Sequence, residues 1–225
     1  MANNNTQDKQ AMRQESIEQG VSKTQEFLEK NKKKIYTVVG IILAIALIIL
    51  AYNKFIYQPK CDEAQQQAFP AELNFQKGEF ELALNGDGNV LGFADIIDNY
   101  GAKAGKAAYL YAGVCELQLG NWQEAIDYIK KYNGKEPILA ARAKACEGDA
   151  YVGLENYDAA VKCFEAAATM SDNVIAAGYY LKAGLAYEKL GQKDKALKCY
   201  ETIKDLYPQS IEAYDVERYI SRVAE

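Results

Sequence analysis

The sequence contains no histidine among its 225 residues. Histidine is the side chain most used for proton transfer near neutral pH and the commonest metal ligand, so its absence argues against an enzyme and against a metal site. The five cysteines include no Cys-x-x-Cys pair, and no P-loop, Gly-x-Ser-x-Gly or paired-carboxylate motif is present. We therefore expect no catalytic residues, no metal and no cofactor.

Positive charge is scarce after the first 34 residues. Residues 1–34 hold seven of the 26 Lys/Arg and five of the 31 Asp/Glu, which leaves 19 basic and 26 acidic residues, a net charge of −7, for the rest. Binding to nucleic acid depends on Lys and Arg that neutralise phosphates, so nucleic acid is not an expected partner. Residues 1–34 are too polar to form a core, and we expect a partly disordered tail.

Charge is absent altogether from residues 35–52, within "KNKKKIYTVVGIILAIALIILAY". A helix of these 18 residues would be about 27 Å long, close to the thickness of the hydrocarbon layer of a bilayer. The sequence therefore predicts one transmembrane anchor over residues 35–57. No small-residue cleavage site follows it, which favours an uncleaved anchor over a signal peptide.

Lysines are concentrated on the N-terminal side of this apolar stretch. Four lie before it and two after it: Lys30, Lys32, Lys33 and Lys34, then Lys54 and Lys60. The positive-inside rule predicts a cytoplasmic N-terminus and a main domain on the other side of the membrane. In a bacterium that arrangement is a single-pass inner-membrane protein with a periplasmic domain.

An internal period governs the chain after residue 100. Three segments align: "AAYLYAGVCELQLGNWQEAIDYI", "ARAKACEGDAYVGLENYDAAVKCF" and "GYYLKAGLAYEKLGQKDKALKCY". The period is 35 and then 36 residues, both for Gly113, Gly148 and Gly184 and for Ala125, Ala160 and Ala196. A fixed period of this length is typical of stacked helical repeats.

These segments resemble tetratricopeptide repeats, which are pairs of antiparallel helices of about 34 residues. Aromatic residues that match the pattern are Tyr109, Trp122, Tyr151, Tyr157, Phe164, Tyr180, Tyr187 and Tyr200. Glu116 departs from it, because a tyrosine is usual at that place in the first helix. The resemblance implies an all-α solenoid of about three units over residues 106–225, closed by a cap helix in which Ile211, Tyr214 and Val223 cover the last repeat.

Residues 58–105 fit the same pattern more loosely. Gly78, Phe80 and Ala83 have the offsets of Gly120, Trp122 and Ala125, which predicts a degenerate repeat. The glycine-rich "NGDGN" then interrupts its second helix, which we expect to resume near Val90 and to run to Tyr100. The interpretation is a bend or packing loop; a contact with a partner or a weak cation site is the alternative, although a calcium loop would lack its last glutamate.

The cysteines leave two alternatives open. Cys163 and Cys199 occupy equivalent places in successive repeats, and outside the cytoplasm they could form a disulfide. The other interpretation is that they are buried free thiols that act as small apolar side chains.

In tetratricopeptide repeats the concave groove is lined by the second, fifth, ninth and twelfth positions of the first helix of each pair. Without the small residues, these positions are Leu110, Val114, Leu117, Arg142, Asp149, Val152, Leu181, Leu185 and Glu188. The set is mostly apolar and lacks the Lys and Asn that clamp a peptide carboxylate. Such a groove suits an extended or helical segment of another protein; the alternative interpretation is an inert face of the scaffold.

The layout of a short basic tail, one anchor and a small acidic repeat domain resembles the ancillary subunit of the bacterial SecYEG translocon. That resemblance implies a periplasmic interaction module which hands exported proteins from the translocon to chaperones; its partners would be translocon subunits and exported clients. The alternative is a structural scaffold of a cell-envelope complex, for outer-membrane assembly or cell-wall synthesis. No site residue is carried over from this resemblance.

Overall fold

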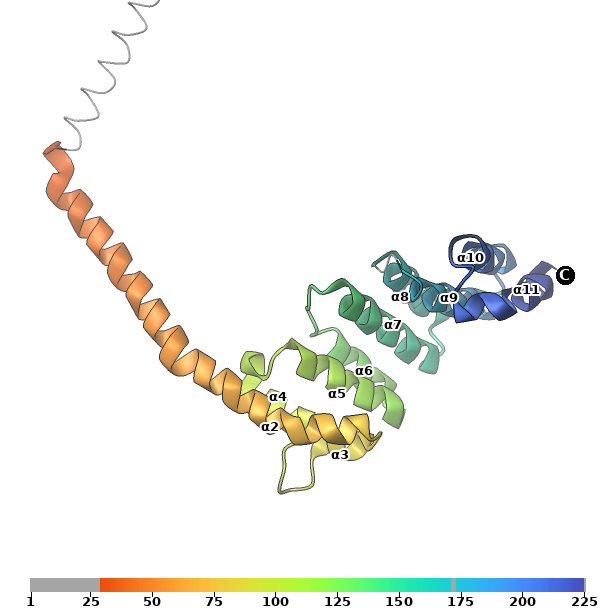
Figure 1. Cartoon of the computed structure of the whole chain (residues 1–225), viewed down its shortest axis with the longest axis horizontal. Coiled ribbons are helices and arrows are strands. Elements are labelled where there is room, and N and C mark those ends of the chain that lie inside the picture. Colours follow the sequence, from red (N-terminus) through yellow and green to blue (C-terminus); the bar gives the residue numbers. More distant parts are fainter. Residues whose placement is uncertain (1–28, 171–172, 225) are drawn as a thin grey trace, which may run out of the picture. The chain divides into compact units, whose positions relative to one another are not determined.

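A computed structural model of the chain describes residues 29–170 and 173–224, and within these ranges it contains helices and turns but no strand (Figure 1). The all-α class predicted from the sequence is confirmed. The expected tail falls outside the described residues as far as residue 28. The chain divides at Gln58 and Pro59 into two units, which we describe separately.

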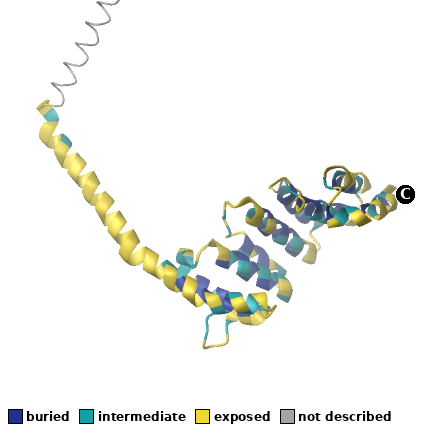
Figure 2. Cartoon of the chain, in the orientation of Figure 1, coloured by how far each residue is buried: buried dark blue, intermediate teal, exposed yellow. Residues whose placement is uncertain are grey.

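The first unit is a single helical stretch. Residues 29–52 are α-helical, and a π-helical turn, η1 (Asn53–Tyr57), follows. Its large apolar side chains, such as Ile41 and Leu47, are exposed along its whole length (Figure 2). The helical run Glu29–Gln76, which includes this stretch, is long and apolar enough by length and composition to cross a membrane.

The second unit, Pro59–Glu225, is a stack of antiparallel helix pairs. The first repeat consists of α2 (Gln58–Gln76), α3 (Phe80–Asn85) and α4 (Phe93–Tyr100), and a 3-10 turn, η2 (Gly101–Ala104), follows. Three pairs come next: α5 (Lys106–Leu119) with α6 (Trp122–Ile129), α7 (Pro137–Gly153) with α8 (Tyr157–Met170), and α9 (Ala176–Lys189) with α10 (Lys193–Leu206). The last helix is α11 (Ile211–Ala224).

Glycines let the two helices of each pair approach closely. Gly113, Gly148 and Gly184 lie on α5, α7 and α9, each facing the second helix of its own pair. A Cβ atom on Gly148 would lie 2.6 Å from a ring carbon of Phe164, and one on Gly184 would lie 2.3 Å from a ring carbon of Tyr200. Both distances are shorter than any van der Waals contact, so the ring of the second helix occupies the space that a side chain would need. The glycine period in the sequence therefore marks the helix crossings.

The core of the stack consists of three clusters rather than one. The N-terminal cluster joins α2 to α5 and includes Phe93, whose ring stacks on Tyr111 at 5.2 Å between centroids. The middle cluster, between α5 and α7, has six buried residues, whereas the C-terminal cluster, from α7 to α11, has 18. The middle cluster is small partly because α6 has only 8 residues, whereas α8 and α10 have 14. Each repeat thus packs only on its neighbours, as expected for a solenoid.

The predicted interruption of the first repeat is present between α3 and α4. Residues 86–92 form the loop, and α4 begins at Phe93, three residues later than the sequence led us to expect. The carboxylate of Asp87 accepts hydrogen bonds from the backbone N–H groups of Asn89 and Val90, both at 2.9 Å. These bonds continue the turn through Val90, so α4 begins only after it.

A close backbone crossing closes this loop. Gly92 lies so near α3 that a Cβ atom on it would be 2.1 Å from the carbonyl oxygen of Leu84. Gly86 has φ +71°, a conformation that favours glycine, and a Cβ atom there would be 2.2 Å from the carbonyl oxygen of Val90. Two of the three glycines are thus required by packing.

The cap helix docks through a different face from the one predicted. Val223 is buried as expected, together with Val216, but Ile211 and Tyr214 are 84% and 86% exposed. The prediction for these two residues was wrong. At 100° per residue, Val216 and Val223 lie on one stripe of α11, with Tyr219 beside it, whereas Ile211 and Tyr214 lie on the opposite side.

Substitution of Gly184 tests the crossing. We expect Gly184→Ala to destabilise the repeat unit by about 1–3 kcal/mol, because the new methyl group would overlap the ring of the fully buried Tyr200. The matched control on α9 is Gly178→Ala, where the new atom would meet only the carboxylate end of Glu212, at 3.0 Å. That control should be neutral or slightly stabilising, because alanine favours helices over glycine.

The measurement is urea unfolding of the full chain in detergent, followed by far-ultraviolet circular dichroism. Equal stability of the two variants would contradict the role given to Gly184.

Candidate protein-binding groove

The groove predicted from the sequence contains an open pocket, located where α7, α8 and α9 meet. It has a volume of about 200 Å³. Three predicted residues line it: Asp149 and Val152 from α7, and Leu185 from α9. Its remaining lining residues are Tyr157, Phe164, Lys182, Ala186 and Lys189. The structure therefore brings together three of the nine predicted groove residues.

An ion pair spans this pocket from one repeat to the next. The ammonium group of Lys182 on α9 lies 2.6 Å and 2.8 Å from the two carboxylate oxygens of Asp149 on α7. The same ammonium group is 5.8 Å from the centre of the Phe164 ring, within the range of a cation–π contact. The charge of Asp149 is thus already balanced within the chain, and the pocket presents an apolar interior below a polar rim.

The helix pair α5 and α6 offers little groove surface. Leu110 is buried in the middle core cluster, and Val114 and Leu117 are half-buried against the same cluster. Their side chains fill the space between α5 and α7 instead of facing a partner. Of the other predicted residues, Arg142 is exposed, and Leu181 packs against the C-terminal cluster.

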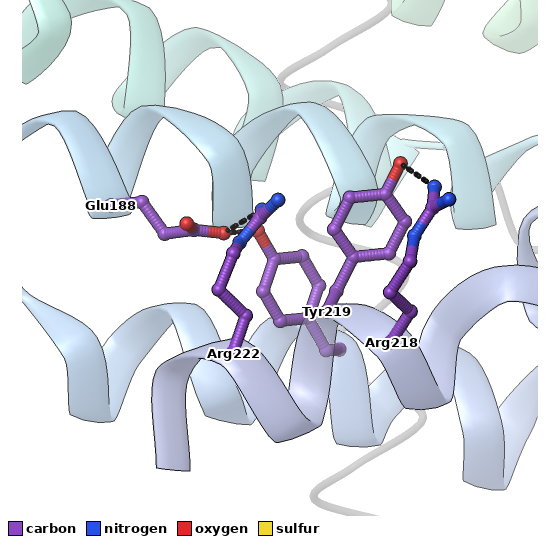
Figure 3. A network of polar contacts seen from close by, with 5 residues as sticks. Glu188, Arg218, Tyr219 and Arg222 are labelled. Atoms are coloured by element: carbon purple, nitrogen blue, oxygen red, sulfur yellow. Dashed lines mark hydrogen bonds and ion pairs between the residues drawn. The ribbon is translucent and has the colours of Figure 1, made fainter. Parts of the chain in front are cut away.

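Glu188 is used inside the protein to hold the cap helix (Figure 3). Its carboxylate accepts a hydrogen bond from the hydroxyl of Tyr200 and forms an ion pair with Arg222 of α11 at 2.6 Å. The ring of Tyr219 lies between Arg218 and Arg222, whose guanidinium carbons are 5.2 Å and 5.0 Å from its centre. Glu188 therefore belongs to the attachment of α11 rather than to open groove surface.

Two opposing influences set the pKa of Glu188. Desolvation tends to raise this pKa, but the hydrogen bonds from Arg222 and Tyr200 stabilise the carboxylate and bring the pKa below its usual value. The Tyr200 hydroxyl has a raised pKa, because of its burial and its bond to Glu188. The carboxylate is therefore charged, and the hydroxyl neutral, across the physiological range.

Sequence reasoning missed the residues that α8 contributes to the pocket. Tyr157 and Phe164 lie on the second helix of their pair, and the rule for concave positions considers only the first. Lys182 and Lys189 were missed because they are one position away from the predicted ones. A signal for Lys182 was nonetheless present, because the oppositely charged Asp149 lies 33 residues earlier, in the preceding repeat.

No group of three or more Cys, Asp or Glu side chains among residues 29–170 and 173–224 is arranged to hold a metal ion. The carboxylate of Asp87 in the loop is occupied by backbone hydrogen bonds, which lower its pKa.

Comparison with known proteins decides the kind of repeat. Residues 93–136 and 147–211 match the family model of the tetratricopeptide repeat. These two stretches carry tetratricopeptide repeats. No curated protein matches the sequence significantly.

Several solved structures share this helical-repeat fold. A crystal structure of MamA protein has a TM-score of 0.54 and 22% identity, over 72% of this chain and 86% of that one. The Cut9–Hcn1 hetero-tetramer of APC/C has a TM-score of 0.55 and 19% identity, over 71% of this chain and 29% of that one. A putative kinesin light chain of Podosopora anserina with TPR-like repeats has a TM-score of 0.56 and 13% identity, over 72% of this chain and 85% of that one. At these identities the likeness concerns the fold alone.

All five cysteines of the repeat protein are free thiols in the structure, so Cys163 and Cys199 are not joined. Burial raises the pKa of both to about 11 and that of Cys115 to about 12. These thiols are therefore protonated and poor nucleophiles at neutral pH. The structure favours the interpretation of them as small apolar core residues.

Alkylation with iodoacetamide tests the state of the thiols. In the native full chain at about pH 8, we expect one fast-reacting thiol, Cys61, because it is not fully buried and because burial raises the pKa values of the other four, Cys115, Cys146, Cys163 and Cys199. Cys61→Ser should abolish the fast phase. Intact-mass analysis after denaturation without reductant should count five alkylated cysteines; a count of three would instead reveal a disulfide.

The attachment of the cap helix predicts a pH-dependent effect. Arg222→Ala should destabilise the repeat unit by about 1 kcal/mol near neutral pH, because Glu188 loses its charged partner. Since the folded pKa of Glu188 is lowered, the stabilisation is complete above the unfolded value of about 4.3 and is lost as pH falls through the folded value. The difference in the free energy of unfolding between the wild type and Arg222→Ala should therefore become smaller below about pH 4.

Urea unfolding at several pH values measures this difference. Arg218→Ala is the control on the same helix, since the ion pair of Arg218 with Asp215 is exposed and long, at 3.8 Å. A constant difference down to about pH 3 would contradict the role of Glu188.

Proposed function

We propose that this chain is a membrane-anchored interaction module whose groove binds segments of other proteins. The observation that carries the proposal is the open pocket at α7, α8 and α9, whose walls include Val152, Leu185 and the ring of Phe164. Apolar surface of this kind, left open in an otherwise packed stack, gains free energy when a partner covers it. Binding rather than catalysis agrees with a sequence that contains no histidine.

The anchor part of the proposal rests on the first unit. Large apolar side chains are exposed all along residues 36–57, and contact with lipid would remove them from water. The lysines before residue 35 support a cytoplasmic N-terminus under the positive-inside rule. In this proposal the repeat unit is periplasmic and the anchor lies in a bacterial inner membrane.

The finer role that we propose is assistance to exported proteins near the translocon. Unfolded chains expose apolar side chains, and a small open pocket with a polar rim would hold such a side chain weakly and release it. The layout of tail, anchor and acidic repeat unit supports the same role. The second candidate is a scaffold of a cell-envelope complex, which is favoured by the exposed Ile211 and Tyr214 on α11.

Photo-crosslinking in intact cells distinguishes the two roles. A crosslinking amino acid at Val152 or Leu185, in the pocket, should capture translocon subunits and many exported chains. The matched control is Leu110, which is buried and should capture nothing. A silent pocket, with one stoichiometric partner captured from Asn89 or Tyr214, would replace this proposal by the scaffold.

A further inference from the structure

Two successive spaces in the stack differ in the side chains that fill them. We call each space between three consecutive helices an interval: the first lies between α5, α6 and α7, and the second between α7, α8 and α9. Trp122 at the start of α6 and Tyr157 at the start of α8 are 35 residues apart and occupy equivalent positions. Gly153 and Lys189, near the ends of α7 and α9, are 36 residues apart and are likewise equivalent. The two intervals can therefore be compared position by position.

The interval between α5, α6 and α7 is filled by a side chain of the protein itself. The indole ring of Trp122 lies on Gly153, so closely that a Cβ atom there would be 2.4 Å from ring carbon Cδ2. The same ring packs against the middle core cluster, as do Val114 and Leu117. A large aromatic side chain from one helix thus occupies the groove side of this interval, where glycine on the next helix leaves room for it.

The next interval, between α7, α8 and α9, has no indole at the equivalent position. A phenol ring replaces the larger indole, and Lys189 replaces the glycine on which the indole lies. The space that remains is the pocket of about 200 Å³, which Val152, Leu185, Ala186 and the Phe164 ring line. The protein itself therefore shows what fits this place in the repeat, because one repeat earlier an indole fills it.

The charges around the pocket indicate what lies beside the bound ring. Lys182 is neutralised by Asp149, whereas Lys189 is in no ion pair within residues 29–170 and 173–224. The lining thus carries one excess positive charge, although the chain after residue 34 has a net charge of −7. A carboxylate on the ligand would complement Lys189, and a lysine there would be repelled.

We infer that this pocket binds one large aromatic side chain of a partner segment, as Trp122 fills the preceding interval, with an acidic residue of that segment beside Lys189. The inference rests on the proposed function and names the chemistry of the segment bound. It concerns an internal segment, because recognition uses a side chain and its neighbour rather than a chain terminus.

Calorimetric titration of the full chain in nanodiscs tests the inference. The probe is a short peptide, acetylated and amidated at its ends, with one tryptophan followed by two aspartates. Peptides with alanine for the tryptophan, or with lysines for the aspartates, should bind at least about tenfold more weakly. Equal binding of the tryptophan and alanine peptides, or of the acidic and basic peptides, would overturn the inference, and so would the absence of binding by all three.

A variant that fills the pocket provides the second arm. Val152→Phe places a ring at the pocket wall and should weaken the tryptophan peptide about tenfold. Leu139→Phe is the matched control: it lies on the same helix, does not line the pocket, and has a similar exposure of 43% against 38% for Val152. Lys189→Gln should reduce the preference for the acidic peptide without changing the need for tryptophan. Equal affinities of the Val152 and Leu139 variants would overturn the assignment of the pocket.

The outcomes separate this inference from the proposed function. Crosslinks from Val152 and Leu185 in cells, together with peptide binding that does not require tryptophan, would leave the groove function intact and remove the pocket assignment. Selective peptide binding in nanodiscs with a silent pocket in cells would support the pocket chemistry and remove the proposed role in export.

Discussion

The repeat unit depends on one contact, that between a glycine of the first helix in each pair and a bulky side chain of the second. At the third pair this contact determines a series of others. Gly184 admits the ring of Tyr200, whose full burial leaves a hydroxyl that needs a hydrogen-bond acceptor. Glu188 provides the acceptor, and its charge in turn attracts Arg222 from α11. The position of the last helix thus follows from the absence of a side chain at residue 184.

The last helix, α11, presents a solvated outer face. Arg218 and Arg222 of α11 lie largely in solvent, with 68% and 48% of their side chains exposed. The guanidinium of Arg218 lies on the ring of Tyr219, so it covers apolar surface while its charge stays in water. A polar outer face is what a terminal repeat needs in order to remain soluble.

Much of the fold could be predicted from the sequence, because the signals concerned are local. The glycine and alanine period marked the helix crossings, and the absence of charge marked the apolar helix. The candidate site was less accessible. Ile211 and Tyr214 were misplaced because the docked stripe of α11 is selected by its neighbours, and Glu188 was assigned to open surface because its partner is 34 residues away. The pocket escaped prediction because it arises from a difference between two equivalent positions, Trp122 and Tyr157.

The unequal division of the core has a mechanical consequence. A linear stack bends most easily where the fewest apolar side chains join adjacent repeats, and here that place is the middle cluster with its six buried residues. Slow changes in curvature should therefore concentrate between α5 and α7. The helices α7 to α9 belong to the part with 18 buried residues, so the walls of the pocket keep their spacing while the solenoid flexes beside them.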